Sequence, residues 1–319
     1  MTASDAPLPA DVEARIAEGA FLLIDKPRGP SSHQVTAWAR GLLGVERAGH
    51  AGTLDPNVSG LLWIGVGPAL KLLPLLLEFP KRYVGVVEFH APVDARDLAR
   101  VAAEFTGPIF QTPPVRSAVR RERRVRTIHR LEIVERTPTR ALLDVVGDSG
   151  TYIRTLAVDL GEALGVGAHL AELRRTGTGP FRETASVTLA ALADAVERAR
   201  AGETGPLGAL LHPIDEVWRE FPHLVLRDAA ASAVAHGAGL ARGGINAVGR
   251  PFASGARVVL VSRGGELVAF GTALVASTAL AERADGWVVR PERVLADPGR
   301  FPPAWRTATT GRPTREAPG

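Results

Sequence analysis

Apolar positions along the first two thirds of the chain follow two different spacings. Short apolar runs bounded by turn residues predict strands at 21–25, 61–66 and 83–89, and two more near 125–134 and 141–146. Longer stretches between them repeat their apolar positions every three or four residues. This part of the chain is therefore predicted to contain both strands and helices.

The helical spacing predicts five helices. Ser31 or Ser32 can cap a helix that runs to about Leu43, because a serine oxygen accepts a hydrogen bond from a free backbone N–H of the first turn. The segment 170–181 is predicted to be short and turn-rich. The remaining helices are expected at about 68–77, 93–105, within 150–164 and at 187–201.

A change of composition near 202–216 marks the expected domain boundary, with a first domain at 21–215 and a second at 220–300. Beyond it, short β-like runs separated by glycine turns surround one alanine-rich helix. This pattern predicts a small, mostly β barrel or sandwich of roughly 75 residues. Residues 1–20 are expected to form a mobile or docked tail, and 301–319 a disordered tail.

Composition removes several classes of function. The 319 residues include no cysteine, which excludes disulfides, cysteine zinc sites and cysteine nucleophiles within this sequence. The phosphate-binding GxxxxGK[ST] loop, the GxSxG elbow and the HExxH zinc motif are also absent. Residues 1–20 do not resemble a signal peptide, and prolines and a lysine interrupt the apolar stretch 60–79, so a soluble, intracellular protein is expected.

The positive charge is concentrated in one block. Seven arginines and one glutamate between Arg116 and Arg130 give +6 in fifteen residues, whereas the whole chain has a net charge of +4. Such a block suggests a polyanion partner, and the alternative is a solvated face. Lysine and tyrosine are scarce, which makes the survivors informative. They are Lys26, Lys71, Lys81, Tyr83 and Tyr152.

Three residues are candidates for chemistry. Asp55 lies in the glycine-rich segment GHAGTLDP, where a carboxylate on a rigid loop could act as nucleophile or base, although an ordinary Asp-Pro turn is the alternative. Tyr83 enters a strand beside a basic pair and could stack on a base, or could be a core aromatic. Arg154 begins a helix, and if it faced Asp55 it would keep that carboxylate ionised and oriented.

Six segments taken together resemble one family, the pseudouridine synthase branch that contains bacterial tRNA pseudouridine-55 synthase and the archaeal and eukaryotic dyskerin-type enzymes. The resemblance covers roughly residues 20–200, and details such as GTLDP favour the dyskerin side. The segments 224–245 and 266–274 resemble a PUA domain, a small RNA-binding β-barrel. The six segments are KPRGPSSH at 26–33, GHAGTLDP at 49–56, Lys-x-Tyr at 81–83, PPVRSAV at 113–119, GTYIRTLAVDLG at 150–161 and LRRTGTGPF at 173–181.

The resemblance implies an α+β fold, with a central mixed or antiparallel sheet flanked by helices in the catalytic domain (21–215) and a β-barrel PUA domain (220–300). It implies isomerisation of uridine to pseudouridine in RNA, a reaction that demands neither cofactor nor metal. Asp55 would act on the ribose, Arg154 would pair with it, and Tyr83 would stack on the flipped base. His50 would border the space that the flipped nucleotide leaves. RNA would be gripped by Arg116, Arg120, Arg121, Arg123 and Arg124.

The archaeal form of the family works as the catalytic subunit of an H/ACA ribonucleoprotein, in which a guide RNA selects uridines of ribosomal RNA. The resemblance therefore implies guide RNA, rRNA and tRNA substrates, a small zinc-binding subunit, a small β-barrel subunit and a kink-turn-binding protein as partners. A stand-alone, guide-independent tRNA pseudouridine-55 synthase is the alternative. The sequence lacks the lysine-rich extensions of nuclear relatives, so a cytoplasmic location is expected.

Overall fold

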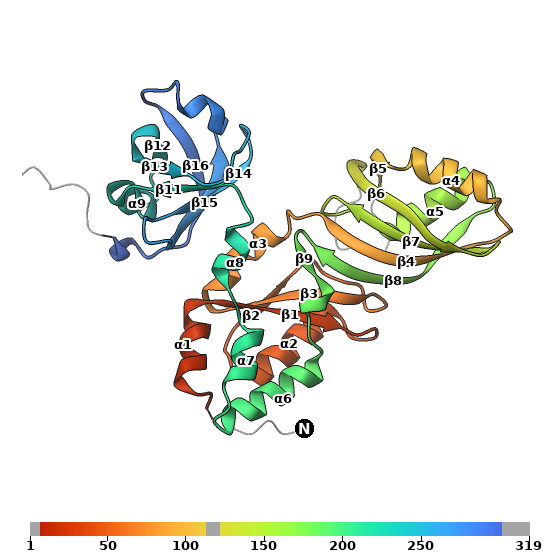
Figure 1. Ribbon diagram of the computed structural model, residues 1–319, viewed down its shortest axis with the longest axis horizontal. Helices are drawn as coiled ribbons and strands as arrows, with labels where there is room; N and C mark the ends of the chain where they lie inside the picture. Colours follow the sequence, from red (N-terminus) through yellow and green to blue (C-terminus); the bar gives the residue numbers. More distant parts are fainter. Residues whose placement is uncertain (1–6, 113–121, 302–319) are drawn as a thin grey trace, which may run out of the picture. The chain divides into compact units, whose positions relative to one another are not determined.

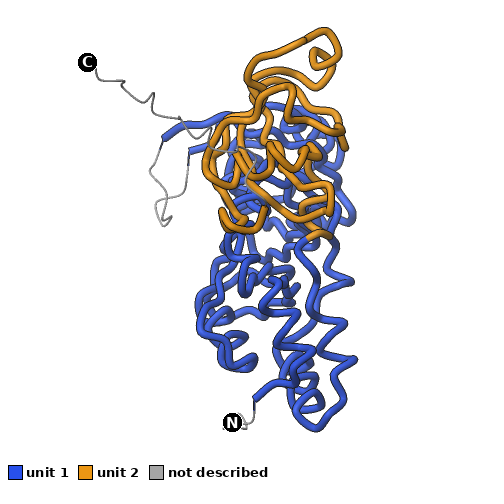
Figure 2. The backbone as a smooth tube through the Cα atoms, turned by 90° about the vertical axis from the view of Figure 1, so that its left-hand side faces the viewer, with its two compact units in different colours: residues 1–214 blue, residues 215–319 orange. Residues whose placement is uncertain are grey.

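The computed structural model describes residues 7–112 and 122–301. The chain divides into two compact units, residues 1–214 and 215–319, which Figure 2 colours separately. Three of the candidate arginines, Arg116, Arg120 and Arg121, lie outside the described residues, as does the predicted tail from residue 302 onward.

A ten-stranded mixed sheet forms the centre of the first unit (Figure 1). Its main path runs β10-β1-β3-β8-β4-β7-β6-β5, with β2 beside β3 and β9 beside β8. Neighbours along this path are antiparallel except β3 and β8, which are parallel. The strands are β1 (Ala20–Lys26), β2 (Ala48–Ala51), β3 (Ser59–Val66), β4 (Lys81–Phe89), β5 (Gly107–Gln111), β6 (Arg124–Arg136), β7 (Arg140–Gly147), β8 (Ala168–Thr178), β9 (Phe181–Arg182) and β10 (His212–Pro213).

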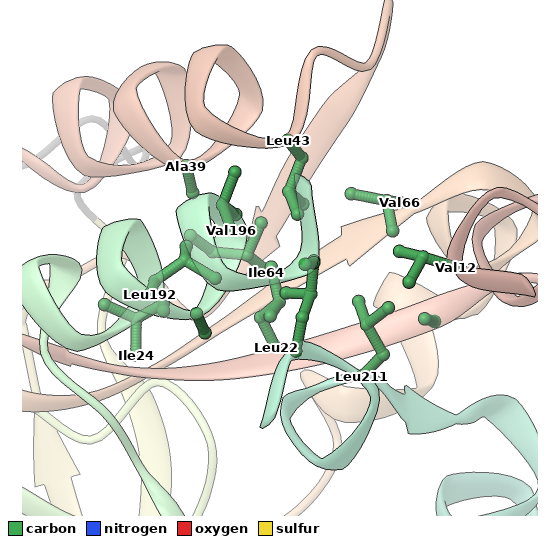
Figure 3. Packing of buried hydrophobic residues seen from close by; sticks show 14 of the residues in the cluster. Val12, Leu22, Ile24, Ala39, Leu43, Ile64, Val66, Leu192, Val196 and Leu211 are labelled. Atoms are coloured by element: carbon green, nitrogen blue, oxygen red, sulfur yellow. The ribbon is translucent and has the colours of Figure 1, made fainter. Parts of the chain in front are cut away.

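One half of this sheet packs against helices that come from the beginning and from the end of the first unit's sequence. Apolar side chains of β1 and β3, such as Leu22 and Ile64, meet those of the helices, such as Leu192 and Val196 (Figure 3). Each of these four side chains is fully buried because the helices present apolar positions at helical spacing. The helices are α1 (Ala10–Glu18), α2 (Ser32–Leu43), α6 (Leu189–Arg200) and α7 (Gly205–Leu210).

The other half of the sheet is covered by α4 (Ala95–Glu104) and α5 (Ile153–Ala163), which Figure 1 shows on one face of the strands β4 to β7. Leu156 and Leu160 of α5 pack there against Val87 and Leu143 of the sheet. Between the two halves, the chain passes through the short helices η1 (Gly67–Leu72) and α3 (Leu73–Leu76). The predicted α+β fold with a mixed central sheet is therefore confirmed.

One prediction along the chain differs from the structure. The segment 170–181 is not short and turn-rich, because it contains most of β8, a strand of 11 residues paired on both sides. Consecutive arginines at 174 and 175 hide its alternation, since arginine usually signals a solvated position. The division between the two units, after residue 214, falls within the expected boundary at 202–216, and this segment also contains α7, whose Leu207 is fully buried. Of the two alternatives for residues 1–20, the docked one holds for α1, whose Val12 is buried.

The second unit has a six-stranded sheet in the order β12-β16-β15-β14-β11-β13 around its own apolar core. Helix α9 (Asp228–Ala235) contributes Ala231 and Val234 to that core. Across the described ranges, no helix is both long and apolar enough to cross a membrane. The other elements are α8 (Ile214–Trp218), β11 (His223–Leu226), β12 (Leu240–Ala241), β13 (Ile245–Val248), β14 (Arg257–Val261), β15 (Leu267–Ala273) and β16 (Trp287–Val294).

Candidate active site

The three residues that the sequence singled out for chemistry line one cavity of about 360 Å³ in the first unit. Asp55 lies on the loop between β2 and β3, Tyr83 near the start of β4, and Arg154 in the first turn of α5. Segments that are far apart in the sequence therefore converge on a single pocket. A neighbouring cavity of about 500 Å³ shares Asp55 and Arg154 and extends to Arg28.

Asp55 and Arg154 form an ion pair between Oδ2 and Nη2. Both side chains are about half exposed, at 50% for Asp55 and 44% for Arg154, so the pair stands at the mouth of the pocket. The pairing expected from the sequence is present. Because the arginine is not buried, it orients the carboxylate while leaving it open to solvent and to a ligand.

Two buried side chains hold the loop that carries Asp55. The Ser32 hydroxyl donates to the Leu54 carbonyl at 2.9 Å and accepts from the Leu54 N–H at 2.8 Å. The fully buried Lys26 ammonium donates to the carbonyls of Pro27, Pro30 and Pro56 at 2.7, 2.8 and 3.4 Å. Ser31, the other predicted cap of α2, forms a capping box with the Gln34 side chain, which leaves Ser32 for the loop.

Arg175 of β8 is a site residue that the sequence reasoning missed. Its side chain lines the cavity and is 1% exposed, and Arg175 lies opposite Tyr83 in the pairing of β8 with β4. Its Nε donates to the Leu61 carbonyl at 2.7 Å, and burial lowers the pKa of Arg175. Predicting a strand here would have identified Arg175, because two consecutive residues of a strand point to opposite faces. In a strand, one of the two arginines of LRRTGTGPF must face the pocket side.

Lys81 is the second buried cation of the cavity wall. Its Nζ donates to the carbonyls of Leu76, Leu77 and Phe79 at 3.2, 2.7 and 2.7 Å and to the Ser149 hydroxyl at 3.4 Å. It therefore ties the end of α3 to the turn that leads into α5. Burial lowers the pKa of Lys81 to about 7, and the positive charge of Arg175 acts in the same direction.

His50 lies beside the Asp55 loop and is not among the residues that line the 360 Å³ cavity. Its Nδ1 lies 3.0 Å from the Thr36 hydroxyl, its Nε2 lies 3.4 Å from that of Thr53, and its ring packs edge-on against His33. Burial lowers the pKa of His50, which favours the neutral ring. The structure thus places His50 next to the loop without bringing it into the pocket.

The described end of the basic block lies on the β5–β6 hairpin. The Arg123 guanidinium lies 4.3 Å from the centre of the Phe110 ring, and Arg124 begins β6. Arg126 lies against the turn before α5. A Cβ added to Gly150 in that turn would lie 3.2 Å from the Nη2 atom of Arg126. The described end of the block therefore reaches the rim of the pocket, which Gly150 lines. Among the described residues, no three His, Cys, Asp or Glu side chains gather in a way that could hold a metal ion.

Three family models match the chain. The TruB family pseudouridylate synthase N-terminal domain matches residues 40–153, and the tRNA pseudouridylate synthase B C-terminal domain matches residues 154–218. The PUA domain matches residues 222–295. These matches cover the pocket and both units of the structure.

Curated relatives match along nearly the whole chain. A probable tRNA pseudouridine synthase B of Methanothermobacter thermautotrophicus is 43% identical over 301 residues, which cover 94% of this chain and 93% of the relative. A protein of the same name from Pyrobaculum calidifontis is 45% identical over 287 residues, covering 90% and 86% of the two chains.

Solved structures match as completely. The chain aligns with one chain of a Cbf5-Nop10-Gar1 complex at a TM-score of 0.83 and 37% identity, covering 93% of this chain and 92% of the other. It aligns at 0.81 and 35% identity with a chain of an H/ACA RNP bound to a substrate RNA containing 2′-deoxyuridine, covering 96% and 94%. The resemblance noted in the sequence is confirmed. This chain belongs to the TruB/Cbf5 family of pseudouridine synthases and is an RNA isomerase that carries a PUA domain.

Proposed function

We propose that this chain converts selected uridines of ribosomal RNA to pseudouridine as the catalytic subunit of an H/ACA ribonucleoprotein, and that it also acts on position 55 of tRNA. The observation that carries the proposal is the extent of the likeness. Chains from H/ACA complexes align with both units, over 93% to 96% of this chain, with TM-scores from 0.81 to 0.83.

The pocket residues fit this chemistry in the following roles. The Asp55 carboxylate reacts at the ribose, either by adding to C1′ or by assisting removal of the C2′ proton, and both routes need it ionised beside Arg154. Tyr83 stacks on the flipped uracil and takes part in removing the C5 proton. His50 borders the space left by the nucleotide, and the arginines from Arg116 to Arg126 grip the RNA backbone.

The proposed partners follow from the same likeness. Solved neighbours contain Cbf5 together with Nop10, Gar1 or substrate RNA. For this chain we propose small subunits of the same kind: a zinc-binding subunit, a β-barrel subunit, and a kink-turn-binding protein recruited by the guide RNA. Any zinc would then belong to the partner subunit. We place the working complex in the cytoplasm, as the resemblance to the archaeal form suggests.

A stand-alone tRNA pseudouridine-55 synthase is the second candidate function. The names of the curated relatives favour it, since proteins called probable tRNA pseudouridine synthase B are 43% and 45% identical to this chain. This function would use the same pocket and would require neither guide RNA nor partner subunits.

The deciding experiment compares two substrates. The purified chain is incubated with a tRNA transcript, or with an rRNA fragment, each with and without guide RNA and the small subunits. Pseudouridine is measured after digestion to nucleosides. Guide-dependent product in rRNA is the result expected from the main proposal, whereas product in tRNA alone would establish the second candidate.

A further inference from the structure

Arg175 differs from its neighbour in how its charge is compensated. Arg174, on the other face of β8, donates to both Asp25 oxygens at 2.9 Å and to Glu183 at 2.6 Å. Arg175 has no carboxylate ion-pair partner within the described ranges, although its side chain is almost completely buried. A buried cation without a counter-ion is costly, so its retention calls for a function.

The surroundings of Arg175 are built to hold the guanidinium in one position. The Leu61 carbonyl anchors Nε, and Tyr83 of β4 is the cross-strand partner of Arg175. Two glycines with positive φ make room for this residue, Gly52 for the guanidinium and Gly60 for the backbone. A Cβ on Gly52 would lie 3.0 Å from Nη1, and a Cβ on Gly60 would lie 2.2 Å from the Arg175 carbonyl oxygen. Nη2 is buried and has no hydrogen-bond partner among the described residues.

Among the described residues that line the pocket, positive charges outnumber negative ones. Among the described residues that line the cavity, Asp55 is the one acid, and it is already paired with Arg154. Arg175 then adds one buried positive charge, and Lys81, whose pKa is lowered to about 7, adds a second when it is protonated. In a poorly solvated pocket these charges favour a ligand that carries negative charge.

The reaction produces such a charge on the uracil ring. When the C1′–N1 bond breaks, its electron pair stays with the base and spreads over N1, O2 and O4. The ring then turns, C5 bonds to C1′, the C5 proton leaves, and N1 gains a proton. Product and substrate therefore have the same atoms, and the negative charge exists only between the two bonds.

We propose that Arg175, which lies opposite Tyr83 in the same pocket, donates a hydrogen bond to the Tyr83 hydroxyl and through it stabilises this transient uracil anion. A hydroxyl that accepts a hydrogen bond from a guanidinium becomes a stronger donor towards its other neighbour. The tyrosine would thus pass the effect of the buried charge to the base that it contacts. Arg175 is accordingly a positioning residue of the known reaction and not a group that touches the substrate. The inference rests on the role proposed above for Tyr83.

The test compares leaving groups within each variant. Single-turnover rates are measured on the RNA that the wild type converts, carrying either uridine or 5-fluorouridine at the target, by loss of the parent nucleoside. Fluorine withdraws electrons and stabilises the ring anion by itself. Arg175→Met should therefore slow uridine more than 5-fluorouridine and raise the ratio of fluorinated to normal rate roughly tenfold. Arg175→Lys, which keeps the charge, should fall between Arg175→Met and the wild type.

Arg174→Met is the matched control. It removes a neighbouring arginine whose charge is paired on the opposite face, so it can lower stability but should leave the ratio unchanged. Because both rates come from one preparation, the misfolded fraction cancels. A wild-type ratio in Arg175→Met, even with both rates reduced, would show that Arg175 only supports the structure and would overturn the proposal.

Discussion

Two lysines support the pocket with contacts that arginine could not reproduce. Lys26 and Lys81 each direct one ammonium at three backbone carbonyls. A compact ammonium can meet acceptors from several directions, whereas the guanidinium of arginine is a flat fork. The chain has 38 basic residues and only three are lysines, so it is telling that two of these three are buried at such positions.

Replacing Asp55 by asparagine should separate binding from chemistry. The amide keeps the size of the side chain but cannot react at the ribose, so pseudouridine formation should fall by more than about a thousandfold. RNA affinity should stay within about threefold, and stability should change by less than about 1 kcal/mol because the ion pair is half exposed. Tritium release and filter binding measure the two effects.

The control for this variant is Asp97→Asn, which removes the carboxylate of an exposed ion pair with Arg100 on α4. It should leave both activity and RNA affinity at the wild-type level. Tritium release above background by Asp55→Asn would remove the central role proposed for this carboxylate.

Lys81 should make folding stability depend on pH. Its pKa is about 7 in the folded chain and near 10.5 when unfolded, so the unfolded state binds more protons between these values. The penalty for burying the charged form is fully present below pH 7 and is relieved as pH rises towards 10.5. The free energy of unfolding of the wild type should therefore rise relative to Lys81→Met over this interval, by up to several kcal/mol.

Denaturant unfolding at pH 6.5, 8 and 9.5 measures this difference. Lys71→Met, at an exposed position, serves as the comparison and should show no such rise. Parallel curves for the wild type and Lys81→Met across these pH values would mean that Lys81 keeps its ordinary pKa in the fold.

Among the elements, several helices could be predicted from the sequence, whereas the strand β8 could not. Helices such as α2 and α6 could be predicted, because one apolar face repeats at helical spacing and a cap residue begins each. The strand β8 could not, because its buried arginine serves a pocket that exists only after β3, β4 and β8 have assembled. The pairing of Asp55 with Arg154 was predictable from the motifs, whereas the supporting contacts of Lys26, Lys81 and Arg175 depend on tertiary structure.

At the β5–β6 hairpin, we expect the basic block to set the salt dependence of RNA binding. The triple change of Arg123, Arg124 and Arg126 to glutamine removes three positive charges beside the pocket. Affinity should fall, and the slope of log K against log salt should lessen by about 2, since each phosphate contact contributes roughly 0.7 on single strands. Filter binding at salt concentrations from about 50 to 300 mM measures this change of slope.

The matching control changes Arg96, Arg100 and Arg198 to glutamine, which removes the same charge from α4 and α6. Its slope should equal that of the wild type. An equal loss of slope in both triple variants would indicate that net charge alone, and not the hairpin, sets the salt dependence.

For the whole molecule, the main feature is that each unit has its own core. Leu22, Ile64 and Leu192 belong to the first, and Leu226 and Leu260 to the second. Two cores allow the RNA-binding unit to be weakened without disturbing the pocket residues, all of which come from the first unit. The contribution of each unit to binding and to conversion can therefore be tested by mutating one unit at a time.

Leu260→Ala should destabilise the second unit by about 2–5 kcal/mol, because it leaves a cavity at a fully buried position of β14. RNA affinity should fall while the conversion rate of RNA already bound, measured in single turnover at saturating enzyme, stays within about twofold. Leu274→Ala, at a leucine that is 42% exposed, is the control and should change neither quantity. A fall in the bound-state rate would show that the second unit also shapes the pocket.

The Lys26 clamp also makes two loops move as one body. The ammonium joins the turn at 27–30 to Pro56, and the Gly29 N–H donates to the same Pro56 carbonyl at 2.8 Å. Any displacement of Asp55 is thus transmitted to Arg28, whose side chain is 53% exposed. Because the chain contains no cysteine, Arg28→Cys would give a single attachment point for a dye. Such a dye would stand at the Arg28 side of the adjoining cavity, away from Tyr83, and would report movements of the active-site loop in real time.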